Sequence, residues 1–395
     1  MDVTGFGVEG DGVADDTKNL QAALDHCSSH EARCLIPHGL KVRITQPVFI
    51  WGNSDLVGDE TAEIHIDIEN LLDRYVLNLG LRRKLESAKA FSGRVENLTF
   101  LVINGPRDKW DGKRRPISGR LVQFWNASDA IITNNTFDIG GYFYAATSGQ
   151  NNRHWLKGLG KRENIQIRNN VISAKAGSHG MEGIGINYAS KVEIINNRIS
   201  GVGDDLIGVH FCDQVTISGN EAGGVDGRIF LANSTNVVVE SNKLFREPSM
   251  LDGKFRKGVS LIYVGYEYPA RVRKPAPENI VIKNNKLEYP DGAIDGGAAI
   301  NIRGASSVLV KDNVIENESS KVTAHGIWIA PWEDPANVDK AKSDPVYPIK
   351  NVSIRDNIMS GAYPLKIVQT GGCDGFKGAI EIKNNASKLR RKVCN

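Results

Sequence analysis

The sequence lacks any long hydrophobic run and carries little excess charge of either sign. No stretch of about 18 apolar residues occurs, so a transmembrane helix is not expected. The 49 lysines and arginines nearly balance the 46 aspartates and glutamates, and a net charge of +3 is too small to predict nucleic-acid binding. An apolar leader is also absent from the first residues, which suits either a cytoplasmic protein or an exported chain without its signal.

Cysteines are few, and their spacing fits no zinc site. Cys27 and Cys34 bracket a short loop, Cys373 and Cys394 lie in the C-terminal segment, and Cys212 is left over. Two local disulfides and one buried thiol would favour export, whereas five free thiols would suit the cytoplasm. We expect a secreted or periplasmic protein and keep the five free thiols as the alternative.

One pattern recurs from about residue 118 onwards. A short β-rich strand is followed by a bend and by a second strand, which ends in an Asn-containing pair and an apolar residue. The second members of these pairs are Asn135, Asn170, Asn197, Asn220, Asn242, Asn285, Asn313, Asn357 and Asn385. Their separations range from 22 to 44 residues, as expected for a coil of minimum length to which loops are added.

This repeat predicts an all-β fold, a single-stranded right-handed parallel β-helix of about 10–12 coils. Asparagine tolerates a left-handed backbone at a sharp bend, and its amide can bond the same amide one coil above and below. Alternation within the strands places Val and Ile inward and Lys, Glu, Arg and Thr outward. A β-sandwich would need hairpin turns such as Asn-Gly between its strands, and an α/β sheet would need amphipathic helices between them; from residue 118 onwards the repeat contains no Asn-Gly pair and no such helix.

The chain is therefore expected to form one domain over 1–395, with an N-terminal cap at 1–40, coils at 41–385 and a tail at 386–395. A helix starting at Asp15 or Asp16 would place Leu20, Ala23 and Leu24 on one face, where they could cover the open end of the solenoid. The basic run that begins at Lys388 is interpreted as a solvated tail.

The residues that open the chain are similar to those of a known superfamily. Phe6-Gly7, Gly10-Asp11-Gly12 and Asp15-Asp16-Thr17 with the following helix resemble the start of pectate-lyase-like β-helix proteins. That superfamily includes polygalacturonase-type glycoside hydrolases, phage tailspike depolymerases, and uronan lyases and epimerases. The resemblance implies the fold over most of the chain, but several chemistries share this scaffold.

Stacking the strands that precede the Asn pairs predicts an outward column of polar and aromatic side chains. The third and fifth positions of these strands are apolar and should point inward, so the positions between them should face outward on one sheet. The column contains Gln123, Trp125, Asn187, His210, Arg228, Phe230, Ser260, Asn301, Arg303 and Trp328. Hydrogen-bonding groups beside flat apolar rings are what sugar units require, so these residues are candidates for binding a polysaccharide.

Carboxylates gather just before the same strands. Glu182 lies in one coil, Asp204 and Asp205 in the next, and Asp226 follows. Groups this close cannot all ionise cheaply, so at least one pKa should be raised. One protonated acid and one carboxylate are what glycoside hydrolysis needs, and Gly183, Gly185 and Gly208 would leave room for the sugar.

The carboxylates also resemble the polygalacturonase-type core, in which an Asp precedes Gly in one coil and an Asp-Asp pair precedes the next strand. Glu182-Gly183 and Asp204-Asp205 fall on these positions, with Glu in place of the first Asp. Two elements depart from the pattern: Asp226-Gly227-Arg228 stands where a His-Gly element is found, and Lys257-Gly258-Val259 where an Arg-Ile-Lys uronate clamp is found. Plain polygalacturonate is therefore not the expected substrate.

Structural interpretations stay open for each candidate. Asp204 and Asp205 are also suited to capping a turn or binding Ca²⁺. His210 could be a packed structural histidine, and Phe230 and Trp328 could cover a loop. Arg228 and Arg303 are equally suited to pairing with neighbouring carboxylates or with substrate.

Three functions remain. The first is a glycoside hydrolase in which Glu182, Asp204 and Asp205 share the catalytic work. The second is a lyase or C5-epimerase acting on a uronate polymer, with His210 and Arg228, or Lys257 and Arg303, as base and charge neutraliser. The third is a non-catalytic carbohydrate-binding β-helix. We expect a polysaccharide or oligosaccharide partner, no nucleic acid or membrane, no cofactor with Ca²⁺ as the alternative, and a monomer with a trimer as the alternative.

Overall fold

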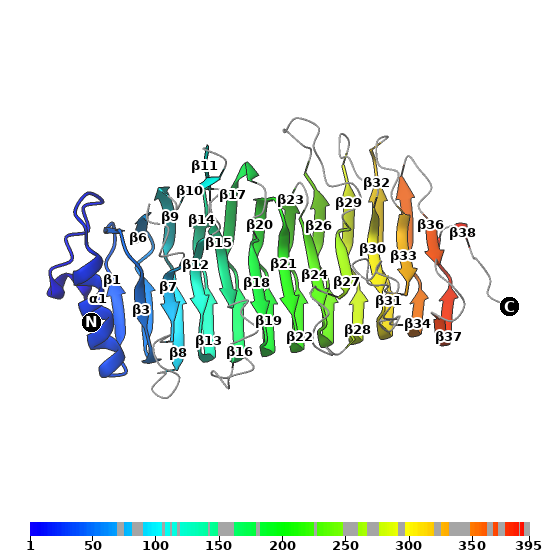
Figure 1. Cartoon of the computed structure of the whole chain (residues 1–395), viewed down its shortest axis with the longest axis horizontal. Coiled ribbons are helices and arrows are strands. Elements are labelled where there is room, and N and C mark those ends of the chain that lie inside the picture. Colours follow the sequence, from blue (N-terminus) through cyan, green and yellow to red (C-terminus); the bar gives the residue numbers. More distant parts are fainter. Residues whose placement is uncertain are drawn as a thin grey trace. The chain divides into compact units, whose positions relative to one another are not determined.

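The computed structural model describes residues 1–68, 75–80, 90–104, 107–110, 113–116, 119–140, 143–148, 162–178, 182–224, 227–247, 260–266, 276–290, 297–319, 325–331, 348–361, 366–369, 376–386 and 388–390. The chain divides into two compact units, 1–203 and 204–395. Within each unit the strands stack in parallel sheets, and successive strands of the chain fall on three sheets in turn (Figure 1). That residues 1–395 form a single domain stays a prediction.

The first unit contains the cap and the first coils. The cap consists of the 3₁₀ helix η1 (Val3–Phe6) and the α-helix α1 (Thr17–Ser29). Sheet A contains β1 (Arg33–Ile36), β4 (Gly52–Asn53), β5 (Asp55–Gly58), β8 (Phe91–Glu96), β13 (Ala127–Thr133), β16 (Arg162–Arg168) and β19 (Ser190–Ile195). Sheet B contains β2 (Lys41–Ile44), β6 (Glu63–Asp67), β9 (Thr99–Asn104), β14 (Thr136–Asp138), β17 (Val171–Ser178) and β20 (Arg198–Val202). Sheet C contains β3 (Val48–Ile50), β7 (Tyr75–Leu79), β12 (Gly119–Phe124), β15 (Phe143–Ser148) and β18 (Ile184–Asn187), and a separate antiparallel pair joins β10 (Arg107–Trp110) to β11 (Lys113–Pro116).

The second unit repeats the three-sheet arrangement. Sheet A contains β22 (Asp213–Ser218), β25 (Thr235–Glu240), β28 (Glu278–Lys283), β31 (Ser306–Lys311), β34 (Ile349–Arg355) and β37 (Phe376–Lys383). Sheet B contains β23 (Glu221–Gly224), β26 (Lys243–Arg246), β29 (Lys286–Tyr289), β32 (Val314–Asn317) and β35 (Ile358–Gly361). Sheet C contains β21 (Asp205–His210), β24 (Arg228–Ala232), β27 (Ile262–Gly265), β30 (Ala298–Arg303), β33 (His325–Ala330), β36 (Lys366–Gln369) and β38 (Lys388–Arg390). The last strand, β38, lies in the segment that the sequence analysis assigned to the tail.

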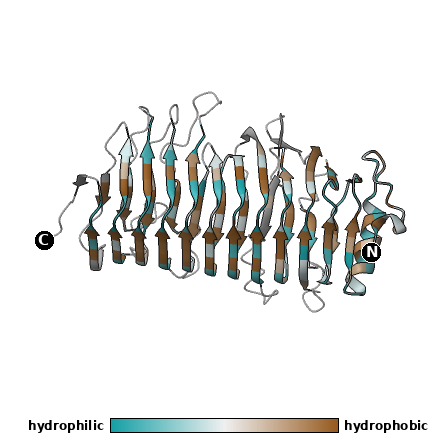
Figure 2. Ribbon diagram, turned by 180° about the vertical axis from the view of Figure 1, so that it is seen from behind, coloured by the Kyte–Doolittle hydropathy of each residue, from teal (hydrophilic) through white to brown (hydrophobic). Residues whose placement is uncertain are grey.

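The strands alternate between buried and solvent-facing residues as predicted. In β28, for example, Ile280 and Ile282 are fully buried while Val281 and Lys283 face outward. Figure 2 shows the same alternation of hydrophobic and hydrophilic residues along the strands of each unit. The core of each unit is therefore a column of Val, Ile and Leu side chains enclosed by three sheets.

Asparagine ladders connect the coils, which confirms the predicted amide-to-amide contacts. In the second unit the Asn242 Nδ2 atom donates to Asn285 Oδ1 at 2.9 Å, and Asn285 Nδ2 donates to Asn313 Oδ1 at 2.9 Å. The same oxygens also accept from backbone N–H groups, at 3.0 Å in both cases. In the first unit the ladder runs from Asn135 through Asn170 to Asn197.

The left-handed backbone, however, does not lie at these ladder residues. It lies at the residue before each one, as at Asn134 (φ 56°), Ser241 (φ 55°) and Asp312 (φ 55°). The first residue of the pair makes the bend, and the second is thereby free to point inward and bond its neighbours. The prediction that the ladder asparagine itself takes the left-handed conformation is wrong.

The N-terminal cap forms as the sequence predicts. The helix α1 begins after Asp16, and Leu20, Ala23 and Leu24 are fully buried. The Asp16 carboxylate is buried and accepts hydrogen bonds from the backbone N–H groups of Glu9 (2.8 Å) and Gly10 (3.1 Å), which holds the preceding glycine turn against the helix. Within the described ranges, no helix combines the length and the apolar character needed to span a membrane.

The described cysteines agree with the predicted pattern. A disulfide joins Cys27 near the end of α1 to Cys34 in β1, and Cys212 is buried and takes no part in a disulfide. Cys373 and Cys394 lie outside the described residues.

We expect Asn285→Ala to lower the free energy of unfolding by about 3 kcal/mol, because buried hydrogen-bonding groups of Asn242, Asn313 and the Val239 carbonyl lose a partner. Urea unfolding followed by circular dichroism measures this loss. The control is Asn53→Ala, an exposed asparagine of β4, for which a change within about 0.5 kcal/mol is expected. Equal stability of the two variants would contradict a structural role for the ladder.

Candidate functional site

The outward face of sheet C in the second unit carries a row of five aligned positions. Parallel pairing places Gly208 opposite Phe230, Phe230 opposite Tyr263, Tyr263 opposite Asn301, and Asn301 opposite Trp328. Neighbouring strands lie about 4.8 Å apart, so consecutive members of this row are lateral neighbours. The predicted positions of Phe230, Asn301 and Trp328 on one face are confirmed.

One register prediction is wrong. Ser260 was expected in the outward column next to Phe230, but β27 begins at Ile262 and Tyr263 occupies that place. Ser260 is buried and precedes the strand. The segment offers two apolar alternations, Val259 with Leu261 and Ile262 with Val264, and the sequence does not decide between them. An aromatic residue between Ile262 and Val264, matching Phe230 between Ile229 and Leu231, is the signal that could have identified Tyr263.

A buried carboxylate lies beside this row. Asp205 is the first residue of β21, and an irregularity between Asp205 and Ile207 sets it opposite Arg228 while Leu206 is buried in the core. The Arg228 Nε atom donates to Asp205 Oδ1 at 2.7 Å. The His210 Nε2 atom lies 3.8 Å from the other carboxylate oxygen, Oδ2.

Gly208 lies close against this group. A Cβ atom at Gly208 would lie 2.8 Å from His210 Nε2 and 3.3 Å from Asp205 Oδ2. The missing side chain therefore lets the His210 ring lie over Gly208, near the Oδ2 atom, while Oδ1 is held by Arg228. The space for a sugar that was expected at Gly208 stays a prediction.

The electrostatics of the group follow from its burial. Burial raises the pKa of Asp205 above its usual 3.8; the charge of Arg228 opposes this rise and that of the neighbouring Asp204 adds to it. Burial alone would lower the pKa of Arg228, but the charge and hydrogen bond of Asp205 raise it overall. Asp204 is half-buried, whereas the Asp205 side chain is only 5% exposed. The two adjacent carboxyl groups thus experience different environments.

Aromatic rings and guanidinium groups extend the site along the sheet. Phe230 packs edge-on against both His210 and Tyr263, with ring centroids 5.0 Å and 5.1 Å apart. The guanidinium carbon of Arg228 lies 4.4 Å from the Phe230 ring centroid, and burial raises the pKa of the Tyr263 phenol. Arg228 therefore both pairs with a carboxylate and stacks on a ring.

A second guanidinium group continues the same face. The Arg303 guanidinium carbon lies 4.5 Å from the Trp328 ring centroid, and Arg303 Nε donates to Asn301 Oδ1 at 3.3 Å. Trp328 and Arg303 are half-buried, so each presents part of its surface to solvent. The face as a whole offers flat apolar rings with hydrogen-bond donors and acceptors between them.

The remaining candidates of the sequence analysis lie elsewhere. Glu182 and Asn187 are buried in the first unit; Glu182 precedes β18 and Asn187 ends it. Gln123 in β12 and Trp125 directly after it are buried in the same unit. Glu182 lies in the first unit and Asp205 in the second, so the predicted closeness of the two side chains stays a prediction. Asp226 and Lys257-Gly258-Val259 lie outside the described residues. Among the described residues, no group of three or more His, Cys, Asp or Glu side chains is arranged to hold a metal ion.

Comparison with known proteins agrees with the fold. Residues 120–247 match the family model described as the right-handed beta helix region. No curated protein sequence matches the chain.

Several solved structures share its architecture. The surface protein and adhesin PfbA of Streptococcus pneumoniae superposes with a TM-score of 0.63 at 18% identity, over 98% of this chain and 96% of that one. The A-module of the mannuronan C-5 epimerase AlgE6 of Azotobacter vinelandii gives 0.55 at 15% identity, over 99% and 100%. A tailspike protein mutant of the E. coli bacteriophage HK620, in complex with a pentasaccharide, gives 0.57 at 12% identity, over 98% and 78%. At these identities the likeness shows the fold alone, and the chain is a right-handed parallel β-helix protein.

Proposed function

We propose that the chain is a polysaccharide-degrading enzyme, a glycoside hydrolase that uses Asp205 as its general acid. The observation that carries the proposal is the buried Asp205 carboxyl, held by Arg228 and next to the half-buried Asp204. Hydrolysis of a glycosidic bond needs one protonated carboxylic acid and one carboxylate. A buried carboxyl whose pKa burial raises, such as Asp205, is suited to the role of the protonated acid.

The roles follow from the partners of the two Asp205 oxygens. Arg228 holds Asp205 Oδ1, so Oδ2 is the atom that would give a proton to the leaving glycosidic oxygen. Asp204 would activate water or attack the sugar. His210 would contact the sugar and steady Oδ2 at 3.8 Å.

The aromatic row would bind the glycan. The half-buried Tyr263 and Trp328 would provide apolar faces for the C–H side of sugar rings, and the half-buried Arg303 would provide hydrogen bonds to hydroxyl groups. The buried Phe230 and Asn301 would support these side chains from below. The carbohydrate-related names of two similar structures, a mannuronan epimerase and a tailspike with a bound pentasaccharide, support a polysaccharide as partner.

A second candidate is a lyase or C5-epimerase acting on a uronate polymer. It is favoured by Arg228 and Arg303, two guanidinium groups beside the aligned row of sheet C. In that chemistry a guanidinium neutralises the substrate carboxylate, and His210 would remove the proton next to it. Likeness to an adhesin keeps a third candidate, a non-catalytic carbohydrate-binding protein.

We also propose that the protein works outside the cytoplasm. The disulfide between Cys27 and Cys34 supports this, because disulfides persist in oxidising compartments.

Asp205→Asn should reduce turnover about 10²–10⁴-fold, the contribution typical of a positioned general acid. The assay is a polysaccharide panel that records both new reducing ends and the ultraviolet absorbance of unsaturated uronate. Asp213→Asn, in sheet A, is the matched control and should keep full activity. Reducing ends with rising absorbance would assign the lyase, and an active Asp205→Asn variant would remove Asp205 from the mechanism.

Gly208→Ala should lower turnover about 10–100-fold, because the added methyl group would lie 2.8 Å from His210 Nε2 and would displace the imidazole from its place beside Asp205. Gly208 has no positive φ, so the backbone accepts alanine there. Gly5→Ala adds a methyl group with nothing within 4 Å and serves as the control. Native turnover in both variants would show that the substrate does not approach Gly208.

The raised pKa of Asp205 predicts a pH dependence of stability. The folded state holds its proton more tightly than the unfolded state, so this group's contribution is fully present below about pH 3.8 and is lost as pH rises through the raised folded pKa. Urea unfolding at a series of pH values, compared between the native chain and Asp205→Asn, isolates this dependence. The native chain should lose stability relative to the variant as pH rises, and parallel curves would contradict a raised pKa.

A further inference from the structure

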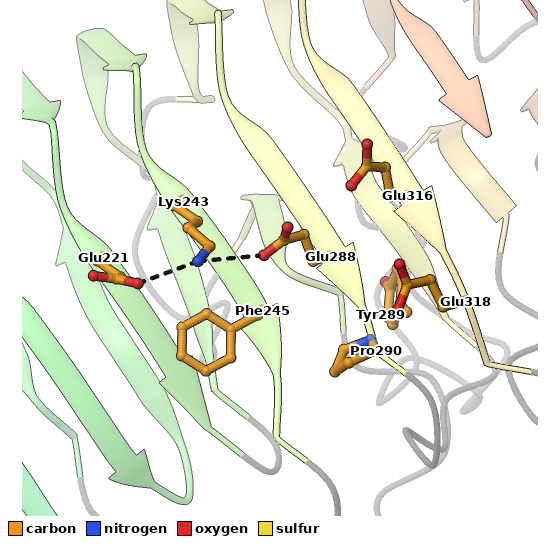
Figure 3. A pocket seen from close by; sticks show the side chains of 8 residues that line it. All are labelled: Glu221, Lys243, Phe245, Glu288, Tyr289, Pro290, Glu316 and Glu318. Carbon is orange, nitrogen blue, oxygen red and sulfur yellow. Dashed lines mark hydrogen bonds and ion pairs between the residues drawn. The ribbon is translucent and has the colours of Figure 1, made fainter. Parts of the chain in front are cut away.

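A second concave site lies on the outward face of sheet B in the second unit. It is a cavity of about 230 Å³ formed by residues of neighbouring strands and the turns after them (Figure 3). Its lining is Glu221, Lys243, Phe245, Glu288, Tyr289, Pro290, Glu316 and Glu318. None of these residues belongs to the candidate site on sheet C.

Phe245 forms an aromatic platform in this cavity. It stands opposite Gly223 in the strand pairing, and a Cβ atom at Gly223 would lie 2.1 Å from its Cε2 atom. The ring therefore lies over the neighbouring strand β23, in the space that a side chain at Gly223 would fill, and Figure 3 shows it face-on. Phe245 is half-buried, so part of the ring remains open to a ligand.

Charged groups surround the ring at regular intervals. The Lys243 ammonium lies 3.2 Å from Glu221 Oε1, 3.8 Å from Glu288 Oε2 and 5.7 Å from the Phe245 ring centroid. In the same way, Lys286 of β29 pairs with Glu288 of its own strand and with Glu316 of the next strand, β32. The lysines keep the carboxylates spread along the sheet, and within the described residues no carboxylate grouping is arranged for a metal ion.

We propose that this cavity binds a neutral hexopyranose unit of a glycan. The Phe245 face would pack on the C–H side of the ring, as flat aromatic surfaces do with apolar ligand faces. Carboxylate oxygens of Glu288, Glu316 and Glu318 accept hydrogen bonds from hydroxyl groups, and charge strengthens such bonds. With four glutamates and one lysine in the lining, the cavity repels uronate and sulfate groups.

The proposal is independent of the catalytic role of Asp205. The two sites lie on different sheets of the same unit, so the cavity on sheet B would hold the glycan as a second attachment point. Two linked contacts with one polymer raise the overall affinity above that of either contact alone.

The test measures binding of neutral oligosaccharides, made of glucose or N-acetylglucosamine units, and of oligogalacturonate by calorimetry and on a glycan array. Phe245→Ala should weaken binding of a neutral oligosaccharide about tenfold or more, as for a central aromatic contact. Ile358→Ala removes a side chain that is 52% exposed on the same sheet, outside the cavity, and should leave binding unchanged. Binding is also measured in an Asp205→Asn background, which stops turnover; Phe245→Ala should weaken binding by the same factor there, which separates the cavity from the proposed catalytic site.

Glu288→Gln is a second variant, which keeps the shape of that side chain and leaves the Phe245 ring in place. It should weaken the same binding several-fold while circular dichroism matches the native chain, and it decides the matter if Phe245→Ala does not fold. The proposal is overturned if the native chain binds no neutral oligosaccharide, if Glu288→Gln and a folded Phe245→Ala bind as the native chain does, or if the Phe245-dependent ligand is the uronate.

Discussion

In-register stacking of parallel strands is the constraint on which each unit depends. The ladder asparagines enforce it, because each Oδ1 atom accepts from both the side chain and the backbone of the preceding ladder residue. A shift of one rung by a single residue would break several buried hydrogen bonds and turn the apolar row outward. Register at the Asn pair thus carries over to the neighbouring strands of the same coil.

Register makes the candidate site out of residues that are distant in sequence. Asp205 and Arg228 are opposite each other only because β21 and β24 pair, and the irregularity after Asp205 is what brings its carboxylate beside the guanidinium. Burying such a pair costs desolvation, which the hydrogen bond offsets only in part. The same loss of hydration disfavours the charged carboxylate and thereby raises the pKa of Asp205.

Sheets B and C use the same backbone for different surface chemistry. Sheet C presents two guanidinium groups stacked on rings, whereas sheet B presents glutamates bridged by lysines around one phenylalanine. Solvent-exposed ion pairs of the latter kind add little to stability, so the sheet B network is not explained by a need to hold the coil together. Missing side chains at Gly208 and Gly223 let the rings of His210 and Phe245 lie over these two positions.

The sequence by itself determined the coil architecture, through the period of the Asn pairs and the alternation within the strands. It also determined the cap, through the amphipathic pattern after Asp16. Both could be predicted because backbone pairing and the burial of apolar faces are local and repetitive requirements. Phe230, Asn301 and Trp328 were placed on one face for the same reason. Tyr263 was missed, because a long insertion before β27 leaves two apolar alternations of equal quality and only packing against β24 selects one. The partners of Asp205, the conformation of the residue before each ladder asparagine and the cavity over Phe245 were decided by tertiary structure alone, since each depends on atoms supplied by a neighbouring coil.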